Sequence, residues 1–189
     1  VDHNHHICHL STAFYLSPFE DAITIAIDGQ GDGFSMSWSL GKRDQPIRMM
    51  GGQSSKYSLG RLWWAISEAC GFPGHHSAGK TMAYASLGSS NGFLIDCVKW
   101  DGLKFKFVHA DIDDEGWREV SQIKAWAESL IVNGKIQSLA DLAANLQELT
   151  THIGTVLAMR LSHEYDHNRV CLAGGVALNG LLNQAINEL

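Results

Sequence analysis

The segment AITIAIDGQGD, residues 22–32, decides the fold. Its first six residues are apolar or β-branched without a break, and they end at Asp28-Gly29. A run of this length and composition is typical of a strand that is buried on both faces, because such a strand has no solvent-facing side for polar residues. The segment therefore predicts a central strand with a glycine-containing turn at its end.

Strands and helices alternate along the rest of the chain. Strands are predicted at 33–40, 92–100, 103–110 and 169–175, and helices at 59–70, 81–88, 138–161 and from Asn179 onward. Asp101-Gly102 favours a two-residue hairpin turn between two of these strands, and the acidic run 111–116 is typical of a solvated loop. This interleaving favours a layered α/β core over a sandwich or a helix bundle.

The composition is that of an ordinary globular domain. The chain has 189 residues, of which 45% are hydrophobic and 18% are charged, enough to bury a sizeable core. Fourteen Lys and Arg against 20 Asp and Glu give a net charge of −6, which argues against a basic surface for nucleic acid. The sequence contains no apolar run of about 18 residues and no secretion signal. Nucleic acid is therefore an unlikely partner, and no membrane association is expected.

The cysteines and the chain ends bear on the compartment and on completeness. The four cysteines are widely spaced and form no C-x-x-C pair, so neither a disulfide scaffold nor a zinc ribbon is predicted. A reducing cytoplasm fits best. The chain begins at Val1 without Met and ends at Leu189 inside an apolar-periodic run, so we expect an excerpt of a longer protein, truncated at both ends.

Four of the ten histidines lie in the first nine residues. His5 and His9 stand four residues apart, so in a helix their imidazoles project from one face and can bind a single ion, such as zinc, iron, manganese or nickel. Pairs at this spacing also occur by chance on solvated helices, and the spacing alone leaves that alternative open. His6 points elsewhere on such a helix, where it can contact a substrate or support the metal ligands.

Two glycine-containing segments follow predicted strands. Asp28–Asp32 lies at a strand end, where α/β sheets bind ligands, and a carboxylate there can hold a cation. Leu172–Asn179 has the order strand, paired glycines, helix, so backbone amides at the helix start can receive phosphate groups. Both segments also fit ordinary tight turns, and the residues alone leave the two interpretations open.

Residues Gly74–Thr81 match the formal P-loop pattern G-x-x-x-x-G-K-[ST]. A P-loop follows a strand, whereas a predicted helix that ends at Gly71 precedes this segment. The context therefore argues against a P-loop.

Taken in order, these segments resemble one family. The stretch HHICHLSTAFYLSPFEDAITIAIDGQGD (5–32) resembles the HHxxHxxSAFxxSPFxxAxxxxxDGxGD signature of NodU/CmcH-type O-carbamoyltransferases. The stretches SLGRLWWAISEACGF (58–72) and GKTMAYASLG (79–88) are similar to the family's middle motifs, SLGxxY, GF and EGKLMGLAxYG. LAGGVALNG (172–180) matches its glycine motif, so the resemblance spans His5 to Gly180.

The resemblance implies a fold and a reaction. The fold is an α/β domain of the actin-like ATPase type (ASKHA, RNase H-like), with a mixed sheet and flanking helices, and residues 1–189 are a partial transfer domain. In the family, carbamoyl phosphate and ATP yield a carbamoyl-adenylate in a separate C-terminal domain. The carbamoyl group then moves to a hydroxyl of a small-molecule acceptor, such as a sugar or an antibiotic-like compound, with the help of a divalent metal, commonly iron(II).

Carried over position by position, the resemblance also assigns site residues. His5 and His9 become metal ligands, Asp28 becomes a third ligand or a carboxylate in the shell around the metal, and His6 and Asp32 are the catalytic candidates. The residues assigned to ATP or the carbamoyl-adenylate are Gly29, Gly31, Lys80, Gly174, Gly175 and Asn179. The chain departs from the family next to Lys80, where Ala78 replaces a glutamate and residues 83–85 replace Gly-Leu-Ala.

Two further hypotheses remain open. A relative that transfers threonylcarbamoyl to tRNA or matures hydrogenase would share these motifs and act on a macromolecule. An ATP-binding domain that has lost catalysis would share the fold. The SPFEDA and LAGGVALN details favour the branch of the family that acts on small molecules. We expect a cytoplasmic enzyme, and its oligomeric state, with a homodimer as one alternative, is left open.

Overall fold

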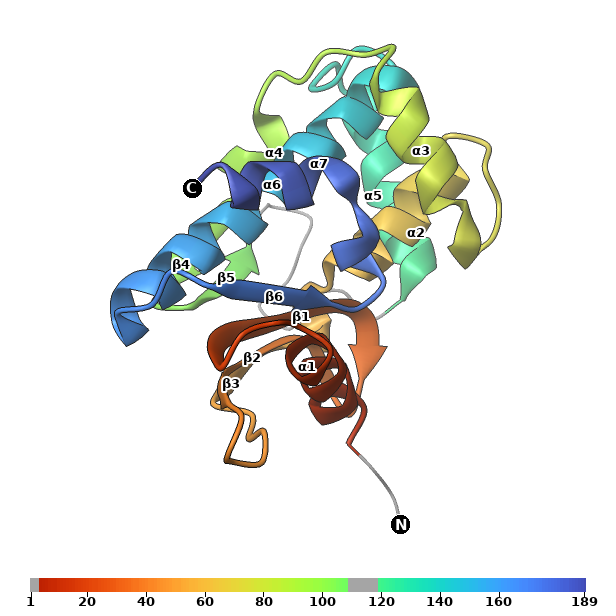
Figure 1. Ribbon diagram of the computed structural model, residues 1–189. Coiled ribbons are helices and arrows are strands. Elements are labelled where there is room, and N and C mark those ends of the chain that lie inside the picture. Colours follow the sequence, from red (N-terminus) through yellow and green to blue (C-terminus); the bar gives the residue numbers. More distant parts are fainter. Residues whose placement is uncertain (1–3, 109–118) are drawn as a thin grey trace. The chain divides into compact units, whose positions relative to one another are not determined.

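The structure is a computed structural model that describes residues 4–108 and 119–189 (Figure 1). The chain divides into two compact units. The first unit consists of Val1–Gly60, Gly102–Lys104 and Gly154–Leu189, and the second of Arg61–Asp101 and Phe105–Ile153. Every predicted site residue except Lys80 therefore belongs to the first unit.

The first unit is built on a four-stranded sheet with the strand order β3-β2-β1-β6. Its elements are α1 (His5–Tyr15), β1 (Asp21–Gly31), β2 (Phe34–Lys42), β3 (Gly51–Ser54), the 3-10 turn η1 (Ser55–Tyr57), β6 (Val170–Ala173), the 3-10 turn η3 (Val176–Leu178) and α7 (Gly180–Asn187). Figure 1 shows β1 between β2 and β6. Since β1 is antiparallel to β2 and parallel to β6, the sheet is mixed, as expected.

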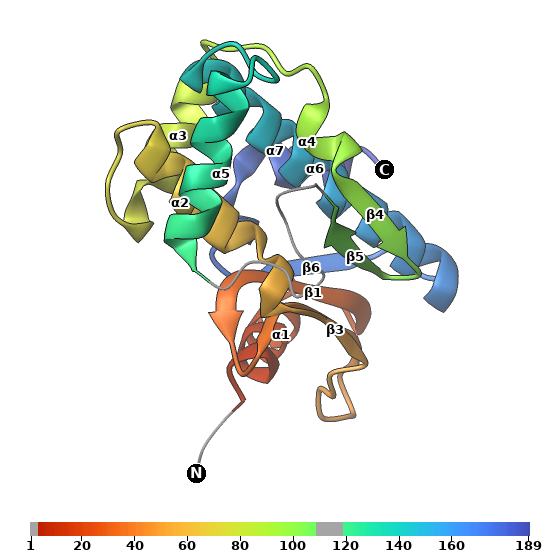
Figure 2. The ribbon, with the colours of Figure 1, turned by 180° about the vertical axis from the view of Figure 1, so that it is seen from behind.

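The second unit is mainly helical. Its elements are α2 (Leu59–Ala69) from Arg61 onward, the 3-10 turn η2 (His75–Ser77), α3 (Ala78–Ala85), α4 (Phe93–Asp96), β4 (Val98–Asp101), most of β5 (Lys104–Phe107) and α5 (Val120–Val132). Helix α6 (Leu139–Tyr165) begins in this unit and ends in the first. The strands β4 and β5 form a separate hairpin, visible in Figure 2. A buried hydrogen bond from Trp63 Nε1 to Thr150 Oγ1, at 2.9 Å, joins α2 to α6 inside the unit.

The two faces of β1 carry side chains of different size. Side chains alternate along a strand, so the isoleucines lie on one face (Ile23, Ile25, Ile27) and small residues on the other (Ala22, Thr24, Ala26). All six are buried, as the sequence predicted. The small face receives helix α1, because Leu10 and Phe14 form one apolar cluster with Ala22 and Ala26.

Arg43, which follows β2, fixes the C-terminal end of α1. Its guanidinium donates to the carbonyl oxygens of Phe19 at 2.9 Å and Tyr15 at 3.0 Å, and a third bond goes to the carbonyl of Ser17. Carbonyls at a helix end have no partner within the helix. One arginine thus supplies charged donors to the end of α1 and to the loop that follows it.

The structure confirms most of the predicted elements and corrects one. The strands predicted at 22–27, 33–40 and 169–175 are present as β1, β2 and β6, and the predicted helices as α2, α3, α6 and α7. The strand predicted from residue 92 is wrong in its first half, because residues 93–96 form the single helical turn α4 after Gly92, which has φ +78. The apolar run FLID fits a helical turn as well as a strand, so its pattern does not separate the two.

Helix α5 is missing from the sequence prediction. Its start carries a capping box, in which Gln122 Oε1 accepts a hydrogen bond from the Glu119 amide at 3.2 Å. The predicted acidic loop that precedes it lies outside the described residues.

Three negative predictions can be compared with the structure. The four cysteines, Cys8, Cys70, Cys97 and Cys171, are free. Within the described residues, no helix has the length and apolar character that crossing a bilayer requires. Gly74–Thr81 follows helix α2 rather than a strand, in agreement with the argument against a P-loop.

We predict that Gly174→Ala destabilises the first unit. Gly174 has φ +94, and a Cβ there would lie 2.3 Å from the carbonyl oxygen of Ile27. Strain and overlap of this kind cost about 1–3 kcal/mol of unfolding free energy. Urea unfolding measures the loss, with Gly180→Ala as the control, because no atom lies within 4 Å of a Cβ at that position. Equal stability of the two variants would contradict the prediction.

Candidate metal centre

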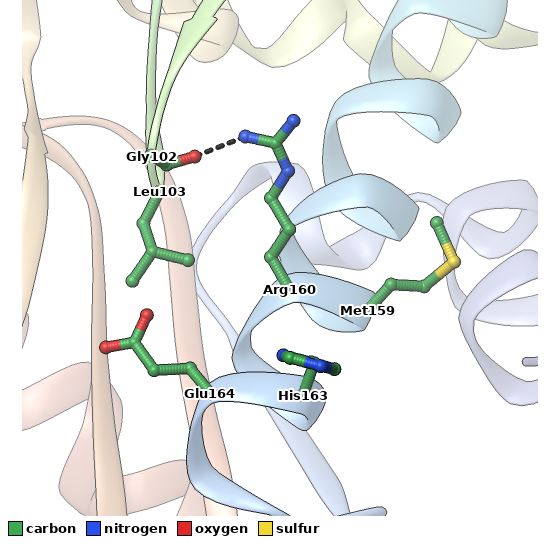
Figure 3. Close-up of a pocket in the computed structure, with 6 residues that line it drawn as sticks. All are labelled: Gly102, Leu103, Met159, Arg160, His163 and Glu164. Carbon is green, nitrogen blue, oxygen red and sulfur yellow. Dashed lines mark hydrogen bonds between the residues drawn. The ribbon is translucent and has the colours of Figure 1, made fainter.

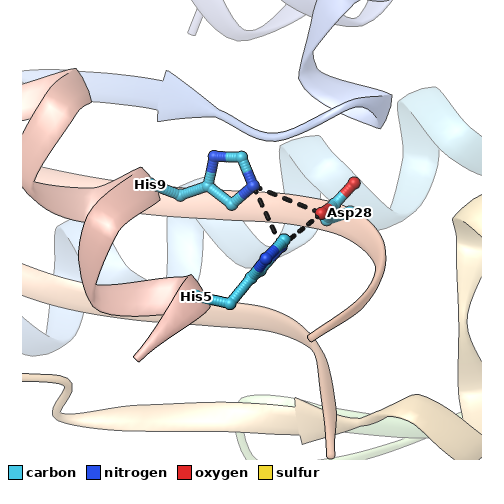
Figure 4. Close-up of side chains that lie close together, drawn as sticks. All are labelled: His5, His9 and Asp28. Atoms are coloured by element: carbon cyan, nitrogen blue, oxygen red, sulfur yellow. Dashed lines mark hydrogen bonds and ion pairs between the residues drawn. The ribbon is translucent and has the colours of Figure 1, made fainter. Parts of the chain in front are cut away.

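Three side chains from two elements of the first unit meet at one point. His5 Nε2 lies 2.7 Å from Asp28 Oδ2, and His9 Nε2 lies 3.2 Å from the same oxygen (Figure 4). The two Nε2 atoms are 3.1 Å apart. Among the residues that the structure describes, no other group of three His, Cys or acidic side chains converges in this way. These are the three residues that the family resemblance assigns as ligands.

Helix α1 presents the two histidines on one side. Asn4 caps the first turn, since its Oδ1 accepts a hydrogen bond from the Ile7 amide at 3.0 Å. His5 and His9 are four residues apart and lie one above the other, with ring centroids 4.6 Å apart. The neighbouring stripe of the helix is the buried one and consists of His6, Leu10 and Phe14.

Asp28 lies where the regular part of β1 ends, on the strand face that carries α1. One carboxylate oxygen faces the histidines, and the other, Oδ1, accepts a hydrogen bond from the Gly175 amide at 3.1 Å. Burial raises the pKa of this carboxyl, but a hydrogen bond from His5 and two from backbone amides outweigh burial and lower the pKa to about 2. Asp28 is therefore ionised at neutral pH.

The donor set suits a divalent metal. Two imidazole nitrogens and one carboxylate form the ligand sets of many iron(II) and zinc sites. Ligand atoms in such sites lie about 2.0–2.2 Å from the ion. Three atoms separated by 2.7, 3.1 and 3.2 Å can all reach this distance from one common point. The side chains of His5 and His9 are 42% and 31% exposed, so an ion and a further ligand can approach.

His6 lies outside the cluster, on the buried side of α1. Its Nε2 is 3.1 Å from the Phe34 carbonyl oxygen, so Nε2 carries the proton, and Nδ1 accepts from the Ser37 hydroxyl at 2.9 Å. Burial lowers the pKa of His6 and keeps the ring neutral. Because both ring nitrogens are bound to β2, this geometry supports an anchoring role for His6 better than the predicted catalytic contact.

Asp32 closes the turn between β1 and β2 and holds the start of α1. Its φ of +48 is a left-handed conformation, which aspartate and asparagine tolerate better than most other residues. Its Oδ2 accepts a hydrogen bond from the His5 amide at 2.6 Å, and a negative charge at a helix N-terminus is favourable. Asp32 therefore positions His5 through the backbone while its carboxylate stays exposed.

Gly29 and Gly31, both predicted to line the nucleotide, flank the cluster differently. A Cβ on Gly29 would meet no atom within 4 Å, so there is open space beside it. A Cβ on Gly31 would lie 2.2 Å from the His5 ring, so Gly31 leaves the room in which that ring sits. Gly31 therefore supports a metal-ligand candidate in addition to its predicted place at the nucleotide.

The later glycine motif reaches the cluster through one residue. Gly175 binds Asp28 through its amide, and Gly174 precedes it in a left-handed conformation that brings the turn onto the end of β1. Asn179 has a local role, because its Oδ1 accepts a hydrogen bond from the Leu182 amide at 3.0 Å and caps α7. The turn that was predicted to bind phosphate is thus tied to the candidate metal ligand.

Lys80 lies in the second unit. It is exposed in the first turn of α3, which begins at Ala78, the position where the family has a glutamate. It is not among the residues that the first unit brings to the cluster. Its role at the nucleotide stays a prediction.

Sequence reasoning missed two residues that touch the backbone beside Asp28. Ser58 Oγ donates a hydrogen bond to the Gly29 carbonyl oxygen at 2.5 Å. A Cβ on Gly60 would lie 2.6 Å from Gly29 Cα. Both belong to the SLG motif, whose match to the family was the available signal, but nothing local in the sequence relates that motif to residue 29.

A separate open pocket of about 570 Å³ lies in the same unit, between the end of α6 and the β4–β5 turn (Figure 3). Its lining residues are Gly102, Leu103, Met159, Arg160, His163 and Glu164. Arg160 donates a hydrogen bond across it to the Gly102 carbonyl. None of the predicted catalytic, nucleotide-binding or metal-binding residues lines this pocket.

We predict that Asp32→Ala destabilises the chain, whereas Asp32→Asn retains most of the stability. Alanine removes the acceptor for the His5 amide and keeps a Cβ at φ +48, and loss of a helix cap typically costs about 1–2 kcal/mol. Asparagine keeps an acceptor oxygen and tolerates this conformation. Urea unfolding of both variants tests the role, and an equal loss of stability in both would contradict the prediction.

Comparison with known proteins agrees with the motif analysis. A family model described as carbamoyltransferase N-terminus matches residues 1–189. An uncharacterized protein of Methanocaldococcus jannaschii is 28% identical over an alignment of 191 residues. The alignment covers 97% of this chain and 35% of that protein. An uncharacterized protein of Synechocystis is 26% identical over 196 residues, covering 95% of this chain and 30% of the relative.

The chain is also similar to the nodulation protein NolO of Bradyrhizobium diazoefficiens. It is 27% identical over 197 residues, which cover 95% of this chain and 32% of NolO. The chain thus spans about a third of the length of these relatives. Because the family model matches the whole chain, the resemblance found in the motifs is confirmed, and the chain belongs to the carbamoyltransferase N-terminus family.

Proposed function

We propose that this chain is the transfer part of an O-carbamoyltransferase, which moves a carbamoyl group from carbamoyl-adenylate to a hydroxyl of a small-molecule acceptor. The observation that carries the proposal is the convergence of His5, His9 and Asp28 at the end of β1, with the Gly175 amide bound to the same carboxylate. In a chain of the carbamoyltransferase family, this arrangement supports the proposal of a metal centre next to a phosphate-binding turn. The mixed α/β sheet is compatible with the actin-like ATPase fold, which belongs to the same proposal.

His5, His9 and Asp28 would hold the metal, and we propose iron(II). Two neutral imidazoles and an ionised carboxylate match the ligands of non-haem iron(II) sites that keep open positions. When bound, such an ion would act as a Lewis acid that offsets the negative charge of the adenylate phosphate and makes AMP a better leaving group.

The adenylate would lie against the glycines next to this cluster. The open space at Gly29 leaves room for a ligand to approach the backbone, and Gly174-Gly175 forms a turn on the end of β1. Exposed backbone amides at such turns bind phosphate oxygens. Lys80 and Asn179 remain assigned to the nucleotide by the family resemblance, although the structure gives Asn179 a capping role as well.

The transfer step balances as a substitution at the carbamoyl carbon. The acceptor oxygen forms a bond to this carbon, and the bond from the carbon to the adenylate phosphate oxygen breaks, with its electron pair leaving on AMP. The acceptor loses its hydroxyl proton to a base. Of the two catalytic candidates, only Asp32 has an exposed side chain, and we propose it as the proton acceptor. His6 would position α1 and thereby the histidine pair.

The metal ligands can be tested by titration alone. We predict that the full-length protein binds one equivalent of iron(II) under anaerobic conditions, and that His5→Ala with His9→Ala weakens binding at least about 100-fold, since one carboxylate remains. The matched control is His76→Ala with His163→Ala, which removes two exposed histidines outside the cluster. The same affinity in both double variants would sink the metal assignment.

The reaction requires the full-length protein, because this chain spans only part of its relatives. With ¹⁴C-labelled carbamoyl phosphate, ATP and a panel of monosaccharides, we expect label in a sugar ester and release of AMP. In the His5→Ala, His9→Ala variant, label transfer should be lost while pyrophosphate release continues, because adenylate formation is proposed to occur elsewhere. Transfer at the wild-type rate in that variant would refute the proposed role of the cluster.

A further inference from the structure

Asp28 sits at a position where strand pairing does not hold the backbone. The pairing of β1 with β2 is regular up to Ile27 opposite Met36, and it resumes only at Gly31 opposite Phe34. Between these pairs the register shifts, so the ladder itself leaves the peptide that carries Asp28 without a fixed partner on β2. A metal ligand needs a fixed direction, so other contacts must determine how this carboxylate points.

The segment Ser58–Gly60 supplies such contacts. The Ser58 side chain is buried, and its Oγ donates to the Gly29 carbonyl oxygen at 2.5 Å. This bond fixes the peptide plane between Gly29 and Gln30, the second peptide after Asp28. A part-buried carbonyl that loses its donor is costly to leave unpaired, so the hydroxyl specifies one orientation of this peptide.

Gly60 adds a steric constraint on the preceding peptide, which joins Asp28 to Gly29. A Cβ at this position would lie 2.6 Å from Gly29 Cα, 2.7 Å from Gly29 N and 3.0 Å from the Asp28 carbonyl carbon. All three are backbone atoms, which cannot turn away as the end of a flexible side chain can. Gly60 is thus a residue whose missing side chain lets the start of α2 lie directly on the Asp28-Gly29 peptide.

We propose that Ser58 and Gly60 are positioning residues for Asp28. Through their contacts with the backbone at Gly29, they keep the Asp28 carboxylate directed toward His5 and His9. The inference rests on the proposed metal function for its consequence, but its structural core concerns only the two peptides on either side of Gly29. The positioning role explains why serine and glycine occupy these two positions. A role in starting helix α2 alone does not explain them, because helix starts accept several other residues.

The first test is metal affinity and metal geometry. The full-length Ser58→Ala and Gly60→Ala variants are titrated with cobalt(II), and its d–d absorption reports the ligand arrangement. We expect each variant to lose about 10- to 100-fold in affinity, as for other residues that orient metal ligands, and to show an altered absorption band. Should Ser58→Ala fail to fold, Ser58→Cys keeps a similar shape with a weaker donor and replaces it.

Matched controls separate positioning from general destabilisation. Ser35→Ala removes another buried serine hydroxyl, which donates to the Ser54 carbonyl at 3.1 Å, and Gly79→Ala adds a Cβ where no atom lies within 4 Å. Both controls should bind cobalt(II) like the wild type. If Ser35→Ala weakens binding as much as Ser58→Ala does at equal thermal stability, the inference is overturned.

A second readout needs no metal. Asp28 Oδ1 accepts a hydrogen bond from the Gly175 amide, so a displaced carboxylate should release that amide. Hydrogen exchange of the peptide containing Gly175 is expected to be faster in Ser58→Ala than in Ser35→Ala. Unchanged exchange would overturn the inference. If the wild type binds no metal but Ser58→Ala still shows this faster exchange, the proposed function is refuted and the positioning role stands.

Discussion

Helix α1 can lie close to β1 only because the strand turns small side chains toward it. Ala22 and Ala26 leave room for Leu10 and Phe14, and this apolar contact sets the distance between helix and sheet. His6 then sets the rotation of the helix, because its ring finds both hydrogen-bond partners on β2 in one orientation. These two hydrogen bonds offset the free-energy cost of burying the polar ring. In any other rotation of α1 the ring nitrogens would lose them, which makes those rotations unfavourable. The His5–His9 stripe follows from this arrangement.

Asp28 joins two parts of the first unit that are far apart in the sequence. One of its oxygens faces the histidines of α1, and the other receives the amide of Gly175 after β6. The parallel pairing of β1 with β6 brings the two strand ends to the same edge of the sheet, so this meeting is a consequence of topology. For the proposed transfer reaction, it means that the carboxylate of Asp28, a candidate metal ligand, is hydrogen-bonded to a candidate phosphate-binding turn.

The local sequence pattern was sufficient to predict elements that form from one long, regular segment of the chain. β1 follows from an unbroken apolar run and α6 from helical periodicity, and their bounds differ from expectation by only a few residues at each end. Residues 93–96 show where pattern is insufficient, because four apolar-rich residues fit one helical turn or half a strand equally well. Helix α5 was overlooked because its N-cap is Glu119, and the sequence signature of a helix start has Ser, Thr, Asp or Asn at that position.

The sequence by itself determined that His5 and His9 share one face if their segment is helical, because residues four apart do so in an α-helix. The family motifs added Asp28 as the third candidate ligand. Only the tertiary structure decided that the three side chains converge, that His6 is buried, and that Ser58 reaches Gly29. The physical reason is that periodicity relates residues within a few turns or along one strand. Distances between separate elements depend on how the elements pack, and packing is set by side chains that no local pattern connects.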